Sequence, residues 1–467
     1  MSWIKKHPLL SVMLLAMAVR LLSLGAYPLT DTTEARYGYM AKLMVMTDNW
    51  LTPQFDIGVP FWGKPPLHTW MSAGSASLLG MSEFALRLPH WLAAAMIVAL
   101  VGWIARRERS SAALAMMTLA TTVIFSIAAG AIMTDMALTL GMTIAMIGFY
   151  LGWQGNYRAG YLGFVGLAIG LLAKGPLIIV LMGLAVGPWL LIQHGLGAFK
   201  VLWQRFPLLT GTAAMFVIAG PWYLAAEKAT PGFLDYFIVG EHYLRFVESG
   251  WQGDLYGSAH DQPRGTIWIY WLSSAFPWSL ILPLLWWRQR KADKPASGVS
   301  AWQSYLLCWM LSPLILFTFA GNILPAYILP GIPALALLCA SLAAQRDWGW
   351  LTKVGMITPV ILLIAVAVMN VKVGPERSDK SLLAGHYQPQ TPLYYLHKRP
   401  FSAQYYSDGR AQFAESIDEL PTVQRYLLAI PSDWNWQQLG LENQQCTVLE
   451  QRRKRQLLEC QPDANLD

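Results

Sequence analysis

The feature that most constrains this chain is a series of apolar windows, each about as long as a bilayer-crossing helix, roughly 20 residues. About eleven such windows precede residue 374, and charged residues gather between them. Only 13% of the 467 residues are charged and 55% are hydrophobic, whereas a soluble chain would carry roughly twice that charge. We therefore predict an all-α polytopic membrane protein. The predicted spans are residues 8–27, 88–105, 111–130, 136–153, 160–173, 176–193, 207–226, 266–287, 303–320, 324–343 and 354–373.

The net charge of +7 has its source in the connections on one side of these spans. That side holds 14 Lys and Arg residues and only three acids, Glu108, Asp293 and Asp347. The positive-inside rule makes it cytoplasmic, together with the N-terminus, so nucleic acid is not an expected partner. The first window resembles a signal peptide, but no convincing cleavage site precedes Pro28, and we expect a retained first helix. An odd number of spans then places the C-terminus outside.

The composition changes at residue 374. Residues 374–467 carry 10 Lys and Arg and 12 Asp and Glu, and the stretch from Tyr394 to Tyr406 includes strand-like alternation. We predict a small soluble α/β or β-rich domain over 374–467, on the outer side of a membrane domain over 1–373.

Cys446 and Cys460 bracket a basic run that is typical of a hairpin turn. A register centred on Arg453 places the two sulfurs opposite each other. In an oxidising periplasm the resulting disulfide would stabilise the domain by roughly 3 kcal/mol. The alternative is two unpaired thiols in a cytoplasmic tail. The same register pairs Leu449 with Leu457 and Val448 with Leu458.

A loop of about 60 residues, 28–89, separates the first two spans on the outer side, and a loop of this length usually has a function. It begins with Asp31 and Glu34, followed by Arg36 and Tyr37 in a segment with one apolar face, which predicts an interfacial amphipathic helix. The two carboxylates are candidate catalytic groups. Their D-x-x-E spacing is also that of a capping box at a helix start.

Lys64 lies further along this loop among aromatic residues, from Phe61 and Trp62 to Trp70. Aromatic side chains around one cation at the membrane face suit the phosphate of a lipid-borne anion. The alternative is that the lysine only reaches phospholipid headgroups.

Ionisable residues at the outer ends of other spans, and in the loop after the span 207–226, complete the candidate site, because charges at membrane depth are costly and mark function. They are Asp135, Lys174, Glu241, His242 and Arg245. Thr134-Asp135 equally suits a helix cap, and Lys174 a contact with headgroups. Arg20, inside the first span, either braces a carboxylate of the site or reaches the headgroups.

In this order the motifs resemble the GT-C membrane glycosyltransferases of family 83, the aminoarabinose lipid A transferase-like enzymes, also called dolichyl-phosphate-mannose protein mannosyltransferase-like. The resemblance covers roughly residues 10–345. Its motifs are Asp31 to Tyr37, Gly63-Lys64-Pro65-Pro66, Asp135, Ala173-Lys174-Gly175, Glu241-His242-Tyr243-Leu244-Arg245-Phe246 and Leu324-Pro325-Ala326-Tyr327-Ile328-Leu329-Pro330.

The resemblance implies a GT-C fold with outer interfacial helices and a polyprenyl-phosphate sugar as donor, undecaprenyl phosphate in a bacterium. Transfer would occur at the periplasmic face of the inner membrane, by inverting displacement at the anomeric carbon. The acceptor would be lipid A, another glycolipid, a glycan or a protein. If it is a phosphate monoester, with a second pKa of about 6, it needs no general base.

Two tasks follow for the candidate residues, since the departing phosphate needs cations and the acceptor must be activated or oriented. The donor-phosphate candidates are Lys64, Arg245, Lys174 and Arg36. The catalytic candidates are Asp31, Glu34 and Asp135. The candidates for acceptor or loop support are Tyr37, Glu241, His242 and Arg20.

Gly63 stands where the type enzyme carries a Glu associated with a metal site, so we expect no obligatory cofactor, a divalent metal being the alternative. We expect a monomer among membrane lipids. The rival function is a transporter or flippase of the same lipid-linked sugar. Transporters tend to have midplane charges and inverted repeats, whereas here the charges lie mostly on one side.

Overall fold

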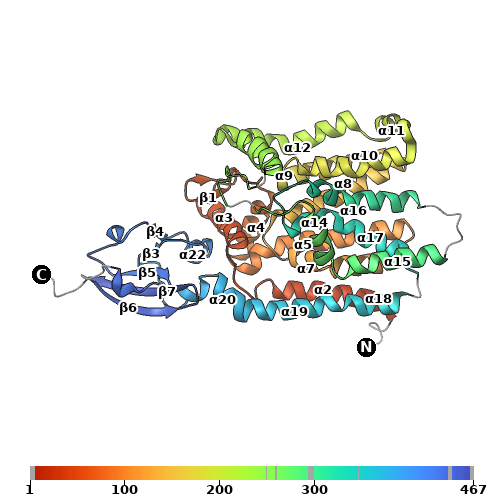
Figure 1. Ribbon diagram of the computed structural model, residues 1–467. Helices are drawn as coiled ribbons and strands as arrows, with labels where there is room; N and C mark the ends of the chain where they lie inside the picture. Colours follow the sequence, from red (N-terminus) through yellow and green to blue (C-terminus); the bar gives the residue numbers. More distant parts are fainter. Residues whose placement is uncertain are drawn as a thin grey trace.

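A helix occupies each of the predicted apolar windows, as expected for a backbone that must satisfy its own hydrogen bonds in lipid. The computed structural model describes residues 6–248, 250–257, 260–292, 299–344, 347–439 and 444–462. Its helices form an elongated bundle with a small sheet domain at one end (Figure 1). The bundle helices are α2 (Pro8–Ser23), α5 (Glu83–Arg107), α6 (Ala112–Ala120), α7 (Val123–Ala128), α8 (Thr134–Trp153), α9 (Tyr157–Lys174), α10 (Leu177–His194), α12 (Leu208–Ala229), α14 (Thr266–Ser274), α15 (Trp278–Ala292), α16 (Ala301–Thr318), α17 (Ile332–Leu342), α18 (Trp348–Gly355) and α19 (Ile357–Val368).

Seven helices within the described ranges are long and apolar enough to cross a membrane, and the bent pair α14 and α15 makes an eighth if counted as one span. The predicted multi-pass membrane fold is therefore confirmed. Some of the predicted windows contain two shorter helices instead of one, and the hydropathy of the window does not reveal this break. Thr121 and Thr122 separate α6 from α7, and their hydroxyls donate to the carbonyl oxygens of the preceding turn at 2.6 and 2.8 Å.

The packing of α8 against α9 depends on glycines. A Cβ atom at Gly148 would lie 2.4 Å from the backbone nitrogen of Gly163, so the two helices approach more closely than a side chain allows. This approach places the end of α9, with Lys174, beside the start of α8, with Asp135.

The bundle has two chemically different ends (Figure 1). We call the end beside the sheet domain the domain end; it carries α3 (Thr33–Thr47) and α4 (Leu67–Leu79). The opposite, basic end carries Arg106, α11 (Ala198–Arg205) and the terminus of α15 with Arg290. The basic connections predicted to share one side thus gather at one end.

The helix predicted to lie at the interface, α3, is more deeply buried than an amphipathic pattern requires. Tyr39, Ala41 and Lys42 are buried together with the predicted apolar face. The reason is the C-terminal domain, whose helix α22 (Phe401–Tyr406) packs on α3.

The C-terminal domain is a five-stranded mixed sheet in the order β4-β3-β5-β7-β6, flanked by short helices. Strand β3 pairs in parallel with β4 and β5, and the remaining neighbours are antiparallel. The predicted small α/β domain is therefore confirmed. Its strands are β3 (Leu393–Leu396), β4 (Ala411–Ala414), β5 (Tyr426–Pro431), β6 (Gln444–Gln451) and β7 (Arg455–Pro462).

Cys446 and Cys460 lie opposite each other on β6 and β7 and form a disulfide, with their Cα atoms 4.2 Å apart. The predicted partners Val448 and Leu458 also face each other.

The predicted pairing of Leu449 with Leu457 is wrong, because Glu450 occupies that place and a bulge follows Val448. The turn is centred between Arg453 and Lys454 instead of on one residue, so one extra residue must be absorbed in β6.

The long helix that begins at Trp348 with α18 continues through α19 and α20 (Gly374–Arg377), past the predicted boundary at 373/374. We therefore propose that the C-terminal domain begins at Ser378, since the change in composition precedes the end of the helix.

The C-terminal domain binds the 28–89 loop through hydrogen bonds and an ion pair. The Lys42 ammonium donates to the Tyr405 carbonyl at 2.6 Å, and the Tyr406 hydroxyl accepts from the backbone of Leu29 at 2.9 Å. Lys380 also forms an ion pair with Glu83 at 2.5 Å. The loop is thus fixed between the bundle and the domain.

Candidate active site

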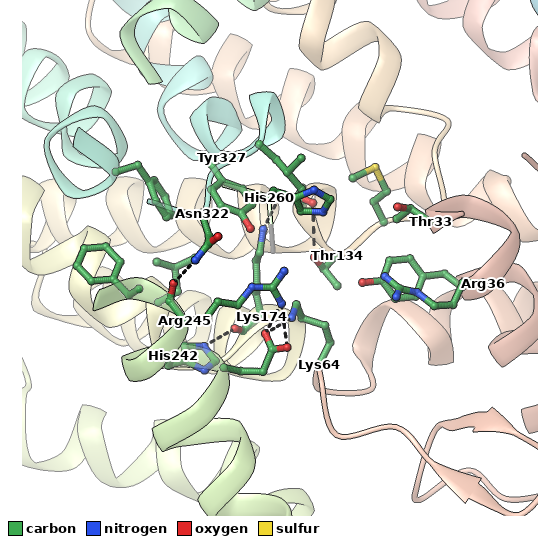
Figure 2. A pocket seen from close by; sticks show the side chains of 18 residues that line it. Thr33, Arg36, Lys64, Thr134, Lys174, His242, Arg245, His260, Asn322 and Tyr327 are labelled. Carbon is green, nitrogen blue, oxygen red and sulfur yellow. Dashed lines mark hydrogen bonds and ion pairs between the residues drawn. The ribbon is translucent and has the colours of Figure 1, made fainter. Parts of the chain in front are cut away.

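A cleft opens at the domain end, between the starts of α3 and α8, the end of α9 and the segments that follow α12 and α16 (Figure 2). It brings together eight of the eleven predicted donor, catalytic and support residues. Those outside it are Asp31, Glu34 and Arg20. The polar residues that line the cleft are Thr33, Arg36, Tyr37, Lys64, Thr134, Asp135, Lys174, Glu241, His242, Arg245, His260, Asn322 and Tyr327.

Glu241 holds two of the predicted cations. Its carboxylate accepts from Lys64 at 2.9 Å and from Arg245 at 2.9 Å, and Asp254 adds a further contact to Arg245 at 3.2 Å. Burial raises the pKa of Glu241, but the charges of Lys64 and Arg245 outweigh burial and hold it below its usual value. This carboxylate therefore stays ionised and fixes both cations at the cleft.

Lys174 and Asp135 form a second, buried ion pair, with 2.5 Å between Nζ and Oδ1. The ammonium also lies 4.4 Å from the centre of the Tyr327 ring. Asp135 is in the first turn of α8, where the helix dipole favours a negative charge. The predicted alternative of a cap is not formed, since the N-cap residue is Met133.

His242 links this pair to the segment after α12. Its ring nitrogens lie 2.7 Å from the Phe237 carbonyl oxygen and 3.1 Å from that of Lys174. Burial lowers the pKa of His242, so the ring is neutral at pH 7. Gly175 makes room for the ring, because a Cβ atom there would lie 2.9 Å from Nε2. The histidine therefore positions the end of α9.

Arg36 and Tyr37 line the cleft from α3. The Arg36 guanidinium donates to the Tyr256 carbonyl oxygen at 2.6 Å and lies 5.2 Å from the Tyr37 ring, while its Nε is buried with no hydrogen-bond partner in the described ranges. Arg36 thus lines the cleft with one buried donor that has no partner in the described part of the chain.

Several lining residues were missed by sequence reasoning, namely Thr33, Thr134, His260, Asn322 and Tyr327. Tyr327 lies inside the motif Leu324 to Pro330 and Thr134 directly precedes Asp135, but neither carries a charge. Thr33 faces the cleft together with Arg36 and Tyr37 of the same motif, which only the start of α3 reveals.

Asp31 instead binds the C-terminal domain. Its Oδ1 accepts from the backbone nitrogen of Ser402 at 3.0 Å and its Oδ2 accepts from the Ser402 hydroxyl. Burial raises the pKa of Asp31 to about 6, with a smaller rise from Asp379, while the Ser402 hydrogen bonds and Arg455 oppose it. Asp31 is therefore a docking residue in this structure.

The raised pKa makes a prediction about stability. The native state binds the Asp31 proton more tightly than the unfolded chain, so this residue's contribution declines as the pH rises from about 4 to about 6. Asp31→Asn removes that decline but can keep both contacts to Ser402. We expect the melting temperature of the detergent-solubilised variant to fall less than that of wild type between pH 4.5 and pH 7.

The matched control is Asp433→Asn, which removes an exposed carboxylate of the same domain and should keep the wild-type slope. An Asp31→Asn protein with that same slope would show that this carboxyl group does not titrate in this range.

Glu34 and Arg20 also lie away from the cleft. Glu34 binds both Nε and Nη2 of Arg87, at 2.8 and 2.9 Å, and the N-cap of α3 is Thr32, so the predicted capping box does not form. Arg20 donates to Ser23, Tyr27 and the Ile127 carbonyl oxygen. None of these partners of Arg20 is a carboxylate of the candidate site.

The cleft does not fit a metal ion. Within the described ranges no three His, Cys, Asp or Glu side chains are placed to hold one. Both ring nitrogens of His242 face carbonyl oxygens, and Glu241 is occupied by two cations. A Cβ atom at Gly63 would lie 2.8 Å from the Phe61 ring, so a longer side chain there requires Phe61 to move.

Sequence comparison places this cleft in a known family. The sequence profile described as dolichyl-phosphate-mannose-protein mannosyltransferase matches residues 3–237, just over half of the chain. The chain belongs to this family. The matched part contains α3, Lys64, Asp135 and Lys174.

Two relatives in this mannosyltransferase family are named undecaprenyl phosphate-alpha-4-amino-4-deoxy-L-arabinose arabinosyl transferase. The protein of Erwinia tasmaniensis is 32% identical over 68% of this chain and 56% of its own length. That of Enterobacter sp. strain 638 is 29% identical over 78% of this chain and 66% of its own length. The chain thus spans less than two thirds of these relatives. The predicted resemblance to the aminoarabinose transferases is confirmed.

Solved structures show the same fold. ArnT from Cupriavidus metallidurans, crystallised bound to undecaprenyl phosphate, superposes with a TM-score of 0.74 at 19% identity, covering 96% of this chain and 97% of that chain. Its apo state gives the same TM-score at 18% identity. The fold of this family member, sheet domain included, is therefore that of ArnT.

Proposed function

We propose that this protein is a glycosyltransferase that moves a sugar from undecaprenyl phosphate to a lipid acceptor of the lipid A class. The name of the relatives supplies the donor and the type of transfer. The observation that carries the proposal is the cleft itself, where Lys64, Lys174 and Arg245 point toward one another from three different elements (Figure 2). Such a cluster suits the phosphate that leaves the sugar.

In the proposed reaction an acceptor oxygen attacks the anomeric carbon of the sugar. The bond between that carbon and the phosphate oxygen breaks, and its electron pair leaves with undecaprenyl phosphate. Lys64 and Arg245, held in place by Glu241, stabilise the charge that develops on this oxygen. Lys174, fixed by Asp135 and His242, closes the cleft from the side of α9.

The acceptor is a phosphate in this proposal. Both carboxylates of the cleft, Asp135 and Glu241, are occupied by cations, and Asp31 and Glu34 lie outside it. A sugar or serine hydroxyl needs a base to become nucleophilic. A phosphate monoester is already ionised at neutral pH, with a second pKa of about 6, and needs none. Arg36, which lines the cleft from α3, is placed to hold it.

We place the cleft and the sheet domain at the periplasmic face of the bacterial inner membrane. The support is the distribution of charge, since the basic end is opposite the domain end and basic connections stay in the cytoplasm. The disulfide between Cys446 and Cys460 fits an oxidising compartment.

Mass spectrometry of the glycolipids from a strain that lacks this protein tests the function. We expect one sugar substituent to disappear from a phosphate of the outer-membrane lipid and the undecaprenyl-phosphate sugar to accumulate. Wild-type protein supplied in trans should restore the substituent. An unchanged glycolipid profile with no accumulated donor would contradict the proposal.

A further inference from the structure

A second hollow lies behind the wall of the cleft that α3 forms. Its volume is about 510 Å³, within the usual range of pockets that hold small molecules, roughly 300–1,000 Å³. It is bounded by the end of α2, the start of α3, the end of α7 and one face of α19. Thr33 and Met133 line both this hollow and the cleft, so the two spaces share a wall. We call the hollow the α19 groove.

The α19 side of this groove is apolar and reaches the surface of the bundle that faces lipid. Its lining from α19 consists of Leu362, Ala365, Val366 and Met369, of which Ala365 is exposed. Ile364, the neighbour of Ala365 in the chain, is 60% exposed, as expected for a span in contact with lipid. An acyl chain can therefore enter the groove directly from the membrane.

The groove also contains two arginines without an acidic partner. Arg20 is 3% exposed, and its guanidinium donates to the uncharged oxygens of Ser23, Tyr27 and Ile127. Arg377 is exposed, and neither arginine forms an ion pair within the described ranges. A buried charge without a counter-ion is costly, so an anionic group beside Arg20 would stabilise it.

The two carboxylates that line the groove have partners of their own. Asp31 accepts from the backbone nitrogen of Ser402 at 3.0 Å, and Glu34 binds Arg87 at 2.8 Å. An anion that enters the groove therefore does not find its two arginines already paired.

The geometry of the proposed reaction favours the same groove. In an inverting displacement the acceptor attacks the face of the sugar opposite the departing phosphate. The cations that suit this phosphate, Lys174 and Arg245, lie on one side of the cleft, whereas Thr33 and Arg36 lie on the other (Figure 2). The acceptor must then come from the side of Thr33, which is where the groove adjoins the cleft.

We infer that the acceptor lipid of the proposed reaction binds in the α19 groove. An acyl chain lies against α19, and an anionic group of the headgroup lies beside Arg20 and Arg377. The phosphate that accepts the sugar reaches the cleft past Thr33. The inference rests on the proposed function and adds the binding site of its second substrate.

The test fills the groove from its lipid side with Ala365→Trp, in the full-length protein in nanodiscs of phosphatidylethanolamine. The acceptor is purified lipid A, and the donor is the undecaprenyl-phosphate sugar that accumulates in the strain without this protein. We expect the KM for lipid A to rise at least about tenfold, because the indole occupies the space of the acyl chain. Displacement of a fluorescent undecaprenyl phosphate should give the wild-type donor affinity, since the cations of the cleft are unchanged.

The matched control is Ile364→Trp, which adds the same side chain one residue away, outside the lining of the groove. This variant should keep the wild-type KM for lipid A. Arg377→Gln, which removes the exposed cation of the groove, should raise that KM by about fivefold or more. Arg377→Lys keeps the charge and should stay near the wild-type KM.

The outcomes separate the acceptor site from the proposed function. A wild-type KM in both Ala365→Trp and Arg377→Gln, or an equal rise in Ile364→Trp, contradicts the site and leaves the transferase function standing. If Ala365→Trp instead changes only how the rate responds to added phosphatidylglycerol, the groove holds a bulk phospholipid, which also contradicts an acceptor site. A wild-type protein that neither binds undecaprenyl phosphate nor transfers its sugar to lipid A contradicts the proposed function, and the acceptor site with it.

Discussion

Replacing Lys64 with alanine is expected to reduce sugar transfer by about 100-fold or more, the usual effect of removing a group that stabilises transition-state charge. The lysine is 18% exposed in its side chain and lies 2.9 Å from Glu241 at the cleft. The fold should survive the change, because Glu241 keeps its bonds to Arg245. The measurement is the initial rate of transfer divided by the amount of protein in the membrane. The donor is the undecaprenyl-phosphate sugar that accumulates in the strain without this protein.

The matched control is Lys228→Ala, which removes an exposed lysine from the end of α12 near the domain end. That variant should transfer at the wild-type rate. A Lys64→Ala protein that keeps its maximal rate and loses only donor affinity would assign Lys64 to ground-state binding. A Lys64→Ala variant with the wild-type maximal rate and the wild-type donor affinity would mean that Lys64 only reaches phospholipid headgroups.

The cations of the cleft could be predicted because charge is rare in this chain. Lys64 stands among aromatic residues of the long outer loop, Lys174 at the end of a predicted span and Arg245 in the loop that follows another span, and at the membrane face such charges need a reason. The sequence pattern does not show which carboxylate each of these cations pairs with. That Lys174 meets Asp135 depends on the glycine contact between α8 and α9, and that Lys64 meets Glu241 joins segments 177 residues apart.

Asp31 and Glu34 lie outside the cleft in which the motif predicted them, and the reason is how α3 is rotated about its axis. Because the N-cap of this helix is Thr32, Thr33 and Arg36 face the cleft while Glu34 turns to Arg87. Asp31 precedes the helix and meets Ser402, which lies 371 residues later. A motif alone specifies neither the rotation of a helix nor a partner in another domain.

The fold was easier to predict than its irregularities. Apolar length located the helices of the predicted spans, but the break at Thr121 and the bend between α14 and α15 depend on hydroxyl bonds and packing that a window of hydropathy averages away. In the sheet domain the disulfide partners followed from a hairpin pattern, whereas the bulge after Val448 depends on how the turn closes.

Arg87→Met is expected to destabilise the protein by about 3–5 kcal/mol, the usual cost of leaving a buried charge without its partner. The Arg87 side chain is fully buried, and its five donors all reach an acceptor. Two reach Glu34, and the others reach the carbonyl oxygens of Leu24, Tyr27 and Pro28, at 2.6 to 3.1 Å. Since a typical domain is stable by about 5–15 kcal/mol, we expect a large loss of folded protein from the membrane.

The measurement is the yield of monodisperse protein and its melting temperature in detergent, with Arg106→Ala as the matched control because that arginine is exposed at the basic end of the same helix. Adding Glu34→Gln to Arg87→Met should recover part of the loss, since the unpaired carboxylate is then gone while the three carbonyl oxygens stay without donors. A double variant no more stable than Arg87→Met would mean that the bonds to the carbonyl oxygens, and not the ion pair, hold the chain before α3. A double variant as stable as wild type would mean that the ion pair holds it. In both cases the segment that aims Thr33 and Arg36 at the cleft is fixed by one arginine that never touches the cleft itself. An Arg87→Met protein as stable as wild type would contradict that dependence.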